Sequence, residues 1–303
     1  MTRSFQIARR DIKLSCVEVR QQIGTLETRM KIDEVGYWSE LKLEIIKKYA
    51  GAYSQILAAQ KPSLEHEYID AFAGAGIHVA KRTGEFIPGS PLNALNIHPP
   101  FKYHHLIDLD GERVEYLRTI TKDRQDVTVY EGDCNTVLLE NVFPKVRYED
   151  YRRALCILDP YRLNPDWTVV AKAGEMKSVE IFLNFMVMDM NMNVLWKNPS
   201  GVAPAQIERM NRFWGDESWR DAAYRREDDL FGHYEEKTGN EDVAEAYRQR
   251  LRNVAGFKYV PRPLPMRNSG GAIIYYLFFA SPNATGARIL EDIFERYRQR
   301  GVR

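Results

Sequence analysis

Four short segments of the sequence place a carboxylate at the end of an apolar, strand-like run. They are Asp70-Ala-Phe-Ala-Gly74-Ala-Gly76, Asp108-Leu-Asp110, Gly132-Asp133-Cys134-Asn135 and Asp159-Pro160-Tyr161. In an open parallel sheet, the carboxyl ends of the strands line the crevice in which ligands bind. The four segments therefore predict a ligand crevice rimmed with carboxylates.

The first segment has the glycine spacing of a cofactor-binding turn. Glycines directly after a strand allow a tight turn and let a ligand approach the backbone closely. The full dinucleotide fingerprint also needs a third glycine and an immediate helix, and neither follows Gly76. The segment predicts a cofactor turn of another kind, and a plain strand-to-loop turn is the alternative.

The other three segments suit hydroxyl, amino and planar groups. Asp108 follows Gly74 by more than 30 residues, compared with roughly 20 in dinucleotide folds, and segment 77–89 accounts for the difference. An acid there can accept both ribose hydroxyls, whereas Asp133 can accept the exocyclic amine of an adenine. Pro160 holds Asp159 extended, and Tyr161 can stack on a flat base. Solvated strand-end acids, Gly-Asp turn chemistry and a proline-terminated strand are the corresponding alternatives.

The elements needed to bring these residues together follow from hydrophobic periodicity. Strands are expected at 67–74, 104–110, 127–133, 154–161 and 179–189, and helical or loop segments at 90–97, 111–122, 134–144 and 165–174. Alternation of strands and helices, with nearly continuous apolar strands, predicts a parallel sheet covered on both faces. A further helix precedes the first strand, because Trp38, Leu41, Ile45 and Tyr49 share one face.

The second half of the chain differs in composition. Segment 203–256 is charged and aromatic, and it is expected to be a helical insertion in which Gly256 can end the last helix in the left-handed conformation. Two strand-like runs separated by a turn at 268–271 follow, and then a helix over 286–299. Alternate methionines at 186–192 indicate one face of a buried strand. The domain boundaries are therefore an N-terminal arm, 1–34, and one domain, 35–303.

Composition excludes several classes of protein. The 303 residues carry a net charge of +1, which gives no overall attraction to nucleic acid or an anionic membrane. The three cysteines form no CxxC pair and the six histidines have no metal-ligand spacing, so we expect no metal site and no disulfide framework. The longest apolar run, at 272–280, is too short to span a bilayer, and we expect a cytoplasmic protein.

The order of these motifs resembles the class I S-adenosylmethionine (SAM) dependent methyltransferases, and "YIDAFAGAG" with "LDPY" is most similar to their nucleic-acid amino-methyltransferase branch. The chain resembles more specifically the three-Cys-motif partner proteins of bacteria and phages. The matching pieces include "YWSELKLEIIKKYAGAY", "VYEGDCN", "RFWGDESW", "YRQRLRNVAGF" and "IIYYLFFASPNATGARILEDI", and together they extend over roughly 35–297. The three-Cys motif belongs to the genomic partner and is not formed by the three cysteines of this chain.

The resemblance implies a Rossmann-like methyltransferase fold with a mostly parallel seven-stranded sheet and helices on both faces. It also implies SAM as cofactor and a role for each motif. The methionine end of SAM would meet Asp70, Phe72, Gly74 and Gly76; the ribose would meet Asp108; the adenine would meet Asp133 and Cys134; and the methyl acceptor would face Asp159, Pro160 and Tyr161. The amino-methyltransferases have Asp or Asn, then two prolines and an aromatic residue. This chain has one proline fewer.

The function implied is methyl transfer from SAM to a nucleobase amine of DNA or RNA, with Asp159 orienting the amine and Tyr161 stacking on a flipped or single-stranded base. One alternative is a non-catalytic SAM-binding accessory protein that acts with a three-Cys-motif partner. Another is a nicotinamide-dependent Rossmann enzyme. Segment 77–88 is expected to form a lid or acceptor-side loop in which Lys81 and Arg82 bind a phosphate. Ser90 is expected both to bind substrate and to cap the delayed helix as its N-cap.

Overall fold

A computed structural model describes residues 32–229, 232–268 and 270–300. Residues 1–31, which include Cys16 and most of the N-terminal arm predicted over 1–34, therefore lie outside the described residues.

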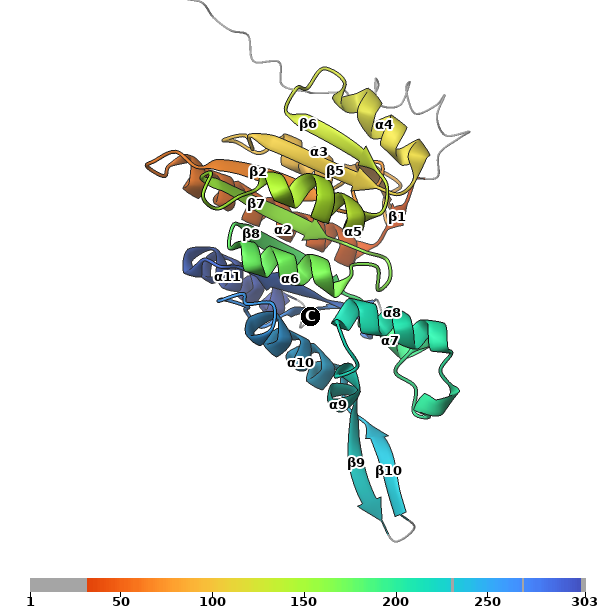
Figure 1. Ribbon diagram of the computed structural model, residues 1–303. Coiled ribbons are helices and arrows are strands. Elements are labelled where there is room, and N and C mark those ends of the chain that lie inside the picture. The colour runs from red at the N-terminus through yellow and green to blue at the C-terminus, as the bar shows by residue number, and fades with distance from the viewer. Residues whose placement is uncertain (1–31, 230–231, 269, 301–303) are drawn as a thin grey trace, which may run out of the picture.

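The centre of the structure is a seven-stranded sheet in the order β11-β12-β8-β7-β2-β5-β6 (Figure 1). Its strands are β2 (Glu65–Asp70), β5 (Tyr103–Asp108), β6 (Val127–Glu131), β7 (Arg152–Leu158), β8 (Val179–Phe185), β11 (Leu264–Arg267) and β12 (Ile273–Ala280). Strands β2, β5, β6, β7 and β8 are parallel to one another, and β12 runs antiparallel to both of its neighbours, β8 and β11. This strand order is that of the class I methyltransferases, and the sequence-predicted fold class is confirmed.

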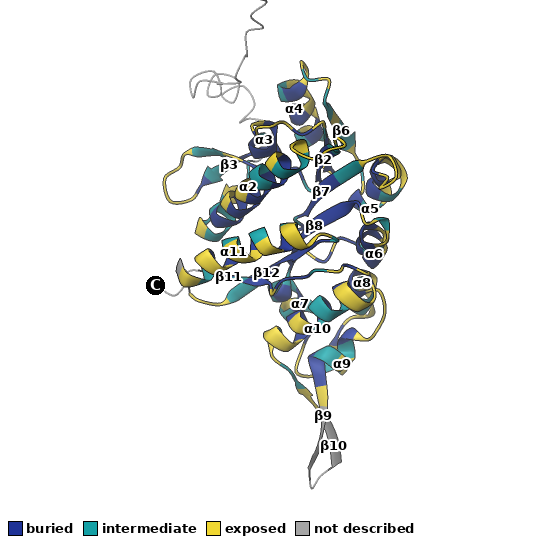
Figure 2. Cartoon of the chain, turned by 90° about the vertical axis from the view of Figure 1, so that its left-hand side faces the viewer, coloured by how far each residue is buried: buried dark blue, intermediate teal, exposed yellow. Residues whose placement is uncertain are grey.

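Helices cover both faces of the sheet (Figure 2). One face is covered by α2 (Tyr37–Ala58), α3 (Ser90–Leu95), α4 (Gly111–Thr121) and α11 (Ala284–Arg300), and the other by α5 (Cys134–Val137), α6 (Trp167–Met176) and α10 (Asn240–Asn253). Successive strand residues alternate between the two cores: Leu155 packs with α2 and α11, whereas Cys156 packs with α6 and α10. Strands buried on both faces have to be apolar throughout, as the sequence predicted.

Segment 77–88 forms a hairpin of β3 (Ile77–Ala80) and β4 (Phe86–Pro88), and β3 pairs with the short β1 (Glu34–Val35). The amide of Gly89 donates to the Gly76 carbonyl at 2.7 Å and closes its base. Helix α3 then begins at Ser90 with Gly89 as its N-cap, so the expectation that Ser90 is the N-cap is wrong. The Ser90 hydroxyl instead hydrogen-bonds the buried carboxylate of Asp70.

Two other expectations about local structure are wrong. Strand β8 ends at Phe185, and the alternating methionines lie at the start of, and within, helix α7 (Val187–Asn193). Segment 203–256 contains α8 (Pro204–Trp214), α9 (Trp219–Ala223) and α10, but between α9 and α10 it forms a hairpin of β9 (Tyr224–Asp229) and β10 (Gly232–Lys237) that projects from the body (Figure 1). Gly256, with φ of +83°, follows α10 in the left-handed conformation, as predicted.

Candidate functional site

A cleft of about 730 Å³ opens at the carboxyl ends of β2, β5, β6 and β7. Strands β2 and β7 are neighbours in the sheet, but the chain passes through β5 and β6 between them. This is the topological switch point of the sheet, where open α/β folds bind their ligands. The sequence-predicted residues that line the cleft are Phe72, Gly74, Ser90, Asp108, Asp133, Cys134, Asp159, Pro160 and Tyr161.

Asp70 and Gly76 lie behind this lining rather than in it. The carboxyl of Asp70 is fully buried, and burial raises its pKa to about 6 despite hydrogen bonds from Ser90, the Phe72 amide and the Tyr68 hydroxyl. It therefore holds the end of β2 to the start of α3. Gly76 has φ of +76°, and a side chain there would lie 3.2 Å from Leu117.

Gly74 is the point at which the backbone is open to the cleft. Its φ is +59°, and a Cβ placed on it would find no atom within 4 Å. Its amide donates to Oδ2 of Asp108 at 2.7 Å, while the other oxygen of that carboxylate accepts from the Asp110 amide at 2.9 Å. Asp108 thus fixes the glycine turn, and the second lone pair of each oxygen can accept from a ligand hydroxyl.

Two further strand-end acids cap helices. Asp110 accepts from the amides of Glu112 and Arg113 at the start of α4, and Asp133 accepts from those of Asn135 and Thr136 at the start of α5. Both are exposed at the rim of the cleft. Cys134 is buried beside Asp133, and burial raises the pKa of its thiol to about 12, so the thiol is a neutral wall of the cleft.

Asp159, the acid after β7, has two partners that the sequence analysis missed. The ammonium of Lys42, on α2, forms an ion pair with its Oδ2, and the side-chain amide of Asn184, on β8, donates to its Oδ1. The side chains of Lys42 and Asp159 are 10% and 23% exposed, so the pair is largely shielded from water. Each carboxylate oxygen retains one lone pair for a further donor.

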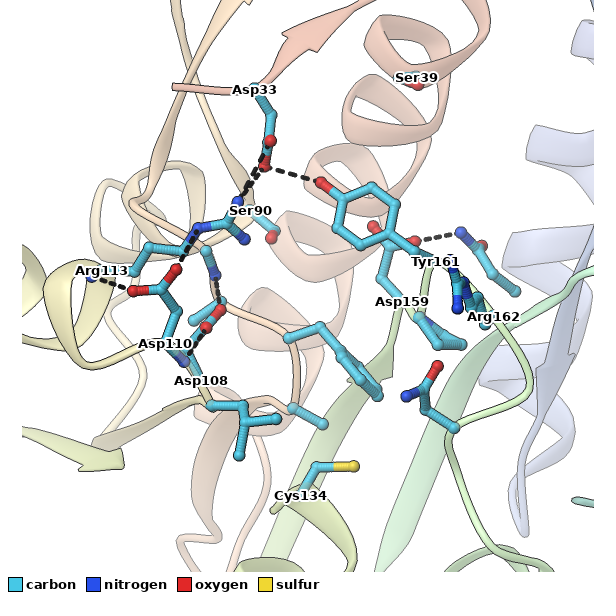
Figure 3. Close-up of a pocket in the computed structure, with 18 of the residues that line it drawn as sticks. Asp33, Ser39, Ser90, Asp108, Asp110, Arg113, Cys134, Asp159, Tyr161 and Arg162 are labelled. Atoms are coloured by element: carbon cyan, nitrogen blue, oxygen red, sulfur yellow. Dashed lines mark hydrogen bonds and ion pairs between the residues drawn. The ribbon is translucent and has the colours of Figure 1, made fainter. Parts of the chain in front are cut away.

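The cleft is bridged at its mouth by Asp33 (Figure 3). Its Oδ2 accepts from the Tyr161 hydroxyl at 2.8 Å and from Arg113 at 2.9 Å. Tyr161 comes from the loop after β7 and Arg113 from α4, so one carboxylate connects two sides of the cleft. The residue Tyr161 remains 66% exposed.

The hairpin of β3 and β4 contributes only its base to the cleft. His78 lines it, and burial lowers the pKa of this imidazole, with the nearby Lys42 acting in the same direction. Lys81 and Arg82 lie in the exposed turn of the hairpin and are not lining residues. The structure does not bring them to the site, and their binding of a phosphate stays a prediction.

The charges of the cleft are divided between its two ends. Lining carboxylates are Asp33, Asp108, Asp110, Asp133 and Asp159, and the lining cations are Lys42, Arg113 and Arg162. Lys42 forms an ion pair with Asp159 and Arg113 forms one with Asp33, so the net charge of each pair is close to zero. The end formed by β2, β5 and β6 retains three carboxylates with only a 3.8 Å contact from Arg113 to Asp110. The end beyond β7 retains Arg162, whose side chain has no partner among the described residues.

Two of the residues that the sequence analysis missed, Lys42 and Asn184, could have been recognised from the sequence. Lys42 follows Trp38 by four residues and precedes Ile45 by three, so it interrupts the apolar face of its helix. Asn184 is a polar residue in the middle of an otherwise apolar run. A buried polar side chain needs a partner, and both could have been singled out on that ground. Asp33 carries no such signal.

Comparisons with known proteins find similarity at the level of structure alone. No protein-family model matches the sequence, and no curated protein matches it. Protein LPL1258 from Legionella pneumophila aligns over 84% of this chain and 91% of its own, with 12% identity and a TM-score of 0.48. TYW2 from M. jannaschii, solved with AdoMet, aligns over 80% and 76%, with 11% identity and a TM-score of 0.32.

A third match, the CurJ carbon methyltransferase, aligns over 79% of this chain and 55% of its own, with 10% identity and a TM-score of 0.39. At TM-scores below 0.5 these matches do not decide the activity, and the fold assignment rests on the strand order. Within the described residues, no three His, Cys, Asp or Glu side chains are placed so that they could hold a metal ion together, and no helix is long and apolar enough to cross a membrane.

Proposed function

We propose that the protein binds SAM in the cleft and transfers its methyl group to an acceptor. The observation that carries this proposal is the group of three carboxylates, Asp108, Asp110 and Asp133, at one end of the cleft, where the 3.8 Å contact of Arg113 with Asp110 is the one cation contact that the described residues supply. SAM carries a sulfonium, an ammonium and two ribose hydroxyls, all of which are favoured next to carboxylates. A nicotinamide dinucleotide carries a pyrophosphate, which needs a glycine turn leading directly into a helix N-terminus. Here the β3–β4 hairpin separates Gly76 from α3.

The residues of the cleft fit this cofactor. Asp108 would accept the ribose hydroxyls, the open side of Gly74 would face the methionine part, and Asp133 with Cys134 would border the adenine. A cavity of about 730 Å³ lies within the size range of cofactor sites. Bound SAM would supply an electrophilic methyl group.

For the acceptor, the proposal is an amino group of a nucleobase. Asp159 would accept one N–H of this amine through a remaining lone pair, and Lys42 and Asn184 would hold its carboxylate in place. The exposed ring of Tyr161 would stack on the base. In the transfer, the amine lone pair forms the new N–C bond, the C–S bond breaks with its electrons going to sulfur, and the amine proton is released to water. No metal is required for this reaction.

A non-catalytic SAM-binding protein that acts with a three-Cys-motif partner is the second candidate. It is favoured by two observations: Asp159 is already engaged by Lys42 and Asn184, and it is followed by a single proline. Such a protein would keep the cofactor end of the cleft and would not use the acceptor end for chemistry.

Titration calorimetry with S-adenosylhomocysteine (SAH) and with NAD⁺ tests the cofactor. We expect SAH to bind and NAD⁺ not to bind, and the reverse result would overturn the proposal. Label transfer from methyl-tritiated SAM to heat-denatured DNA or to RNA tests the chemistry, with Asp159→Ala as the inactive variant. SAH binding without label transfer above that of Asp159→Ala would favour the accessory role.

A further inference from the structure

A second pocket, of about 370 Å³, adjoins the acceptor end of the cleft. It lies between the loop that follows β7 and helices α7 and α8. Four residues line both spaces: Tyr161, Arg162, Met186 and Ile274. The two spaces are therefore contiguous, and they meet beside the Asp159-Pro160-Tyr161 segment.

The walls of the second pocket suit a flat ring. Met186, Met188 and Met192 contribute flexible, polarisable side chains that adapt to the face of a ring. The ring of Tyr161 and the side chain of Ile274 continue this apolar surface. The side-chain amide of Gln206, also in the lining, is a group that recognises the polar edge of a heterocycle, whereas the amide nitrogen of Asn193 already donates to Asp189.

The charge of this compartment favours an acceptor that is neutral or anionic. Arg209 and Asp189 form an ion pair of 2.8 Å whose side chains are 17% and 12% exposed, so the two charges balance. The neighbouring Lys42 and Asp159 balance in the same way. Arg162 is exposed and has no partner among the described residues, which leaves a net positive charge where the two spaces meet. A protonated lysine side chain or a polyamine would be repelled there.

We propose that the second pocket holds the ring of a nucleotide, with its amino group directed into the cleft, and that Arg162 binds the phosphate of that nucleotide. This inference rests on the proposed function and deepens it, because it places the acceptor and gives it a phosphate. A free nucleotide and a nucleotide within a single strand share this chemistry. Arginine matches the geometry of a phosphate, and the other wall of the mouth supplies the Tyr161 ring for stacking.

The first test measures binding to the SAH-saturated protein, with fluorescein-labelled single-stranded DNA of 16 nucleotides and with AMP and CMP as probes. We expect Arg162→Gln to weaken strand binding about fivefold at low salt, and to lower the slope of log K against log salt by about 0.7, the value for one phosphate contact on a single strand. Arg212→Gln is the matched control, because Arg212 is an exposed arginine on α8 that lines neither space. If the mononucleotides bind and respond to Arg162→Gln while the strand does not, the source is a free nucleotide.

The second test fills the pocket. Met188→Trp places an indole where the ring is proposed to lie, and Met188 does not line the cleft that holds the cofactor. We expect SAH affinity to remain within twofold of the wild type and nucleotide binding to fall by at least tenfold.

The outcomes separate this inference from the proposed function. SAH binding by the wild type with no binding of any nucleotide probe would overturn the acceptor pocket and leave the cofactor proposal standing. Equal strand binding by Arg162→Gln and Arg212→Gln would overturn the phosphate contact. Failure of SAH itself to bind would overturn the proposed function first. Polylysine offered with tritiated SAM should receive no label, and labelling of it would contradict the charge argument.

Discussion

The glycine turn after β2 offers the sharpest test of where the cofactor lies. Gly74 and Gly84 both have a left-handed backbone, with φ of +59° and +69°, and at neither position would an added Cβ meet another atom within 4 Å. Alanine at either position costs about 1 kcal/mol of stability, because an L side chain disfavours this conformation. The two glycines differ in place: Gly74 lines the cleft, whereas Gly84 lies in the exposed turn of the β3–β4 hairpin.

The two alanine variants should therefore separate stability from binding. Urea unfolding is expected to give Gly74→Ala and Gly84→Ala the same loss, about 1 kcal/mol each. Calorimetry with SAH is expected to give Gly84→Ala the affinity of the wild type and Gly74→Ala an affinity at least tenfold weaker, which corresponds to about 1.4 kcal/mol. The added methyl group would stand in the space that a glycine turn opens to a ligand.

The refuting result is specific. If Gly74→Ala binds SAH as tightly as Gly84→Ala, the turn is not in contact with the cofactor, and the roles given to Gly74 and Asp108 are wrong. If Gly74→Ala loses much more stability than Gly84→Ala, the comparison of their surroundings is wrong.

Tyr161→Phe removes the hydroxyl that donates to Asp33 across the mouth of the cleft. Stopped-flow measurements should show SAH leaving about fivefold faster, which corresponds to about 1 kcal/mol for an exposed hydrogen bond to a carboxylate. An unchanged rate would mean that this contact does not retain the cofactor. Lys42→Met leaves the carboxylate of Asp159 without its cation, and urea unfolding should show that the free energy of unfolding falls by about 2 kcal/mol. The double variant Lys42→Met/Asp159→Asn should recover part of this loss. If the effects of the two single substitutions simply add, the two side chains do not interact. Asp70 has a pKa raised from 3.8 to about 6 by burial, so its contribution to stability is full below pH 4 and is lost as the pH rises through 6. The wild type should lose about 2.4 kcal/mol between pH 4 and 7 relative to Asp70→Asn, and unfolding free energies that run parallel over this range would contradict the assignment.

The sequence identified the strands that carry the site because two signals coincide there. The run before Asp159 is apolar throughout, as a strand buried on both faces must be, and the first charged residue after it marks where the strand leaves the core. The same reasoning placed Asp108, whereas Asp133 follows its strand-like run only after Glu131 and Gly132. A change from an apolar run to an acid is a local property, so it survives in the sequence without knowledge of the fold.

The parts that sequence reasoning missed depend on distant contacts or lack a core. Lys42 and Asp159 are 117 residues apart, and no local pattern connects them. Among the described residues, strands β9 and β10 pair only with each other. Their sequence shows no alternation of apolar and polar residues, and its charge content suggested a helix. The methionines at 186–192 alternate over a segment that is too short to distinguish a strand end from a helix start by periodicity.

The near-neutral net charge of the chain is compatible with the proposed nucleotide acceptor, because the positive charge of Arg162 lies where the cleft and the second pocket meet. A net charge of +1 gives no long-range attraction to a polyanion, so affinity for a strand has to come from the pocket and from Arg162. Binding that depends on one phosphate contact should be weak and should depend on salt only slightly. A salt slope equivalent to six or more phosphate contacts would require a basic surface elsewhere on the protein, and the acceptor pocket would then be a minor part of recognition. The salt dependence of strand binding therefore decides whether the substrate is selected at the cleft or on a larger surface.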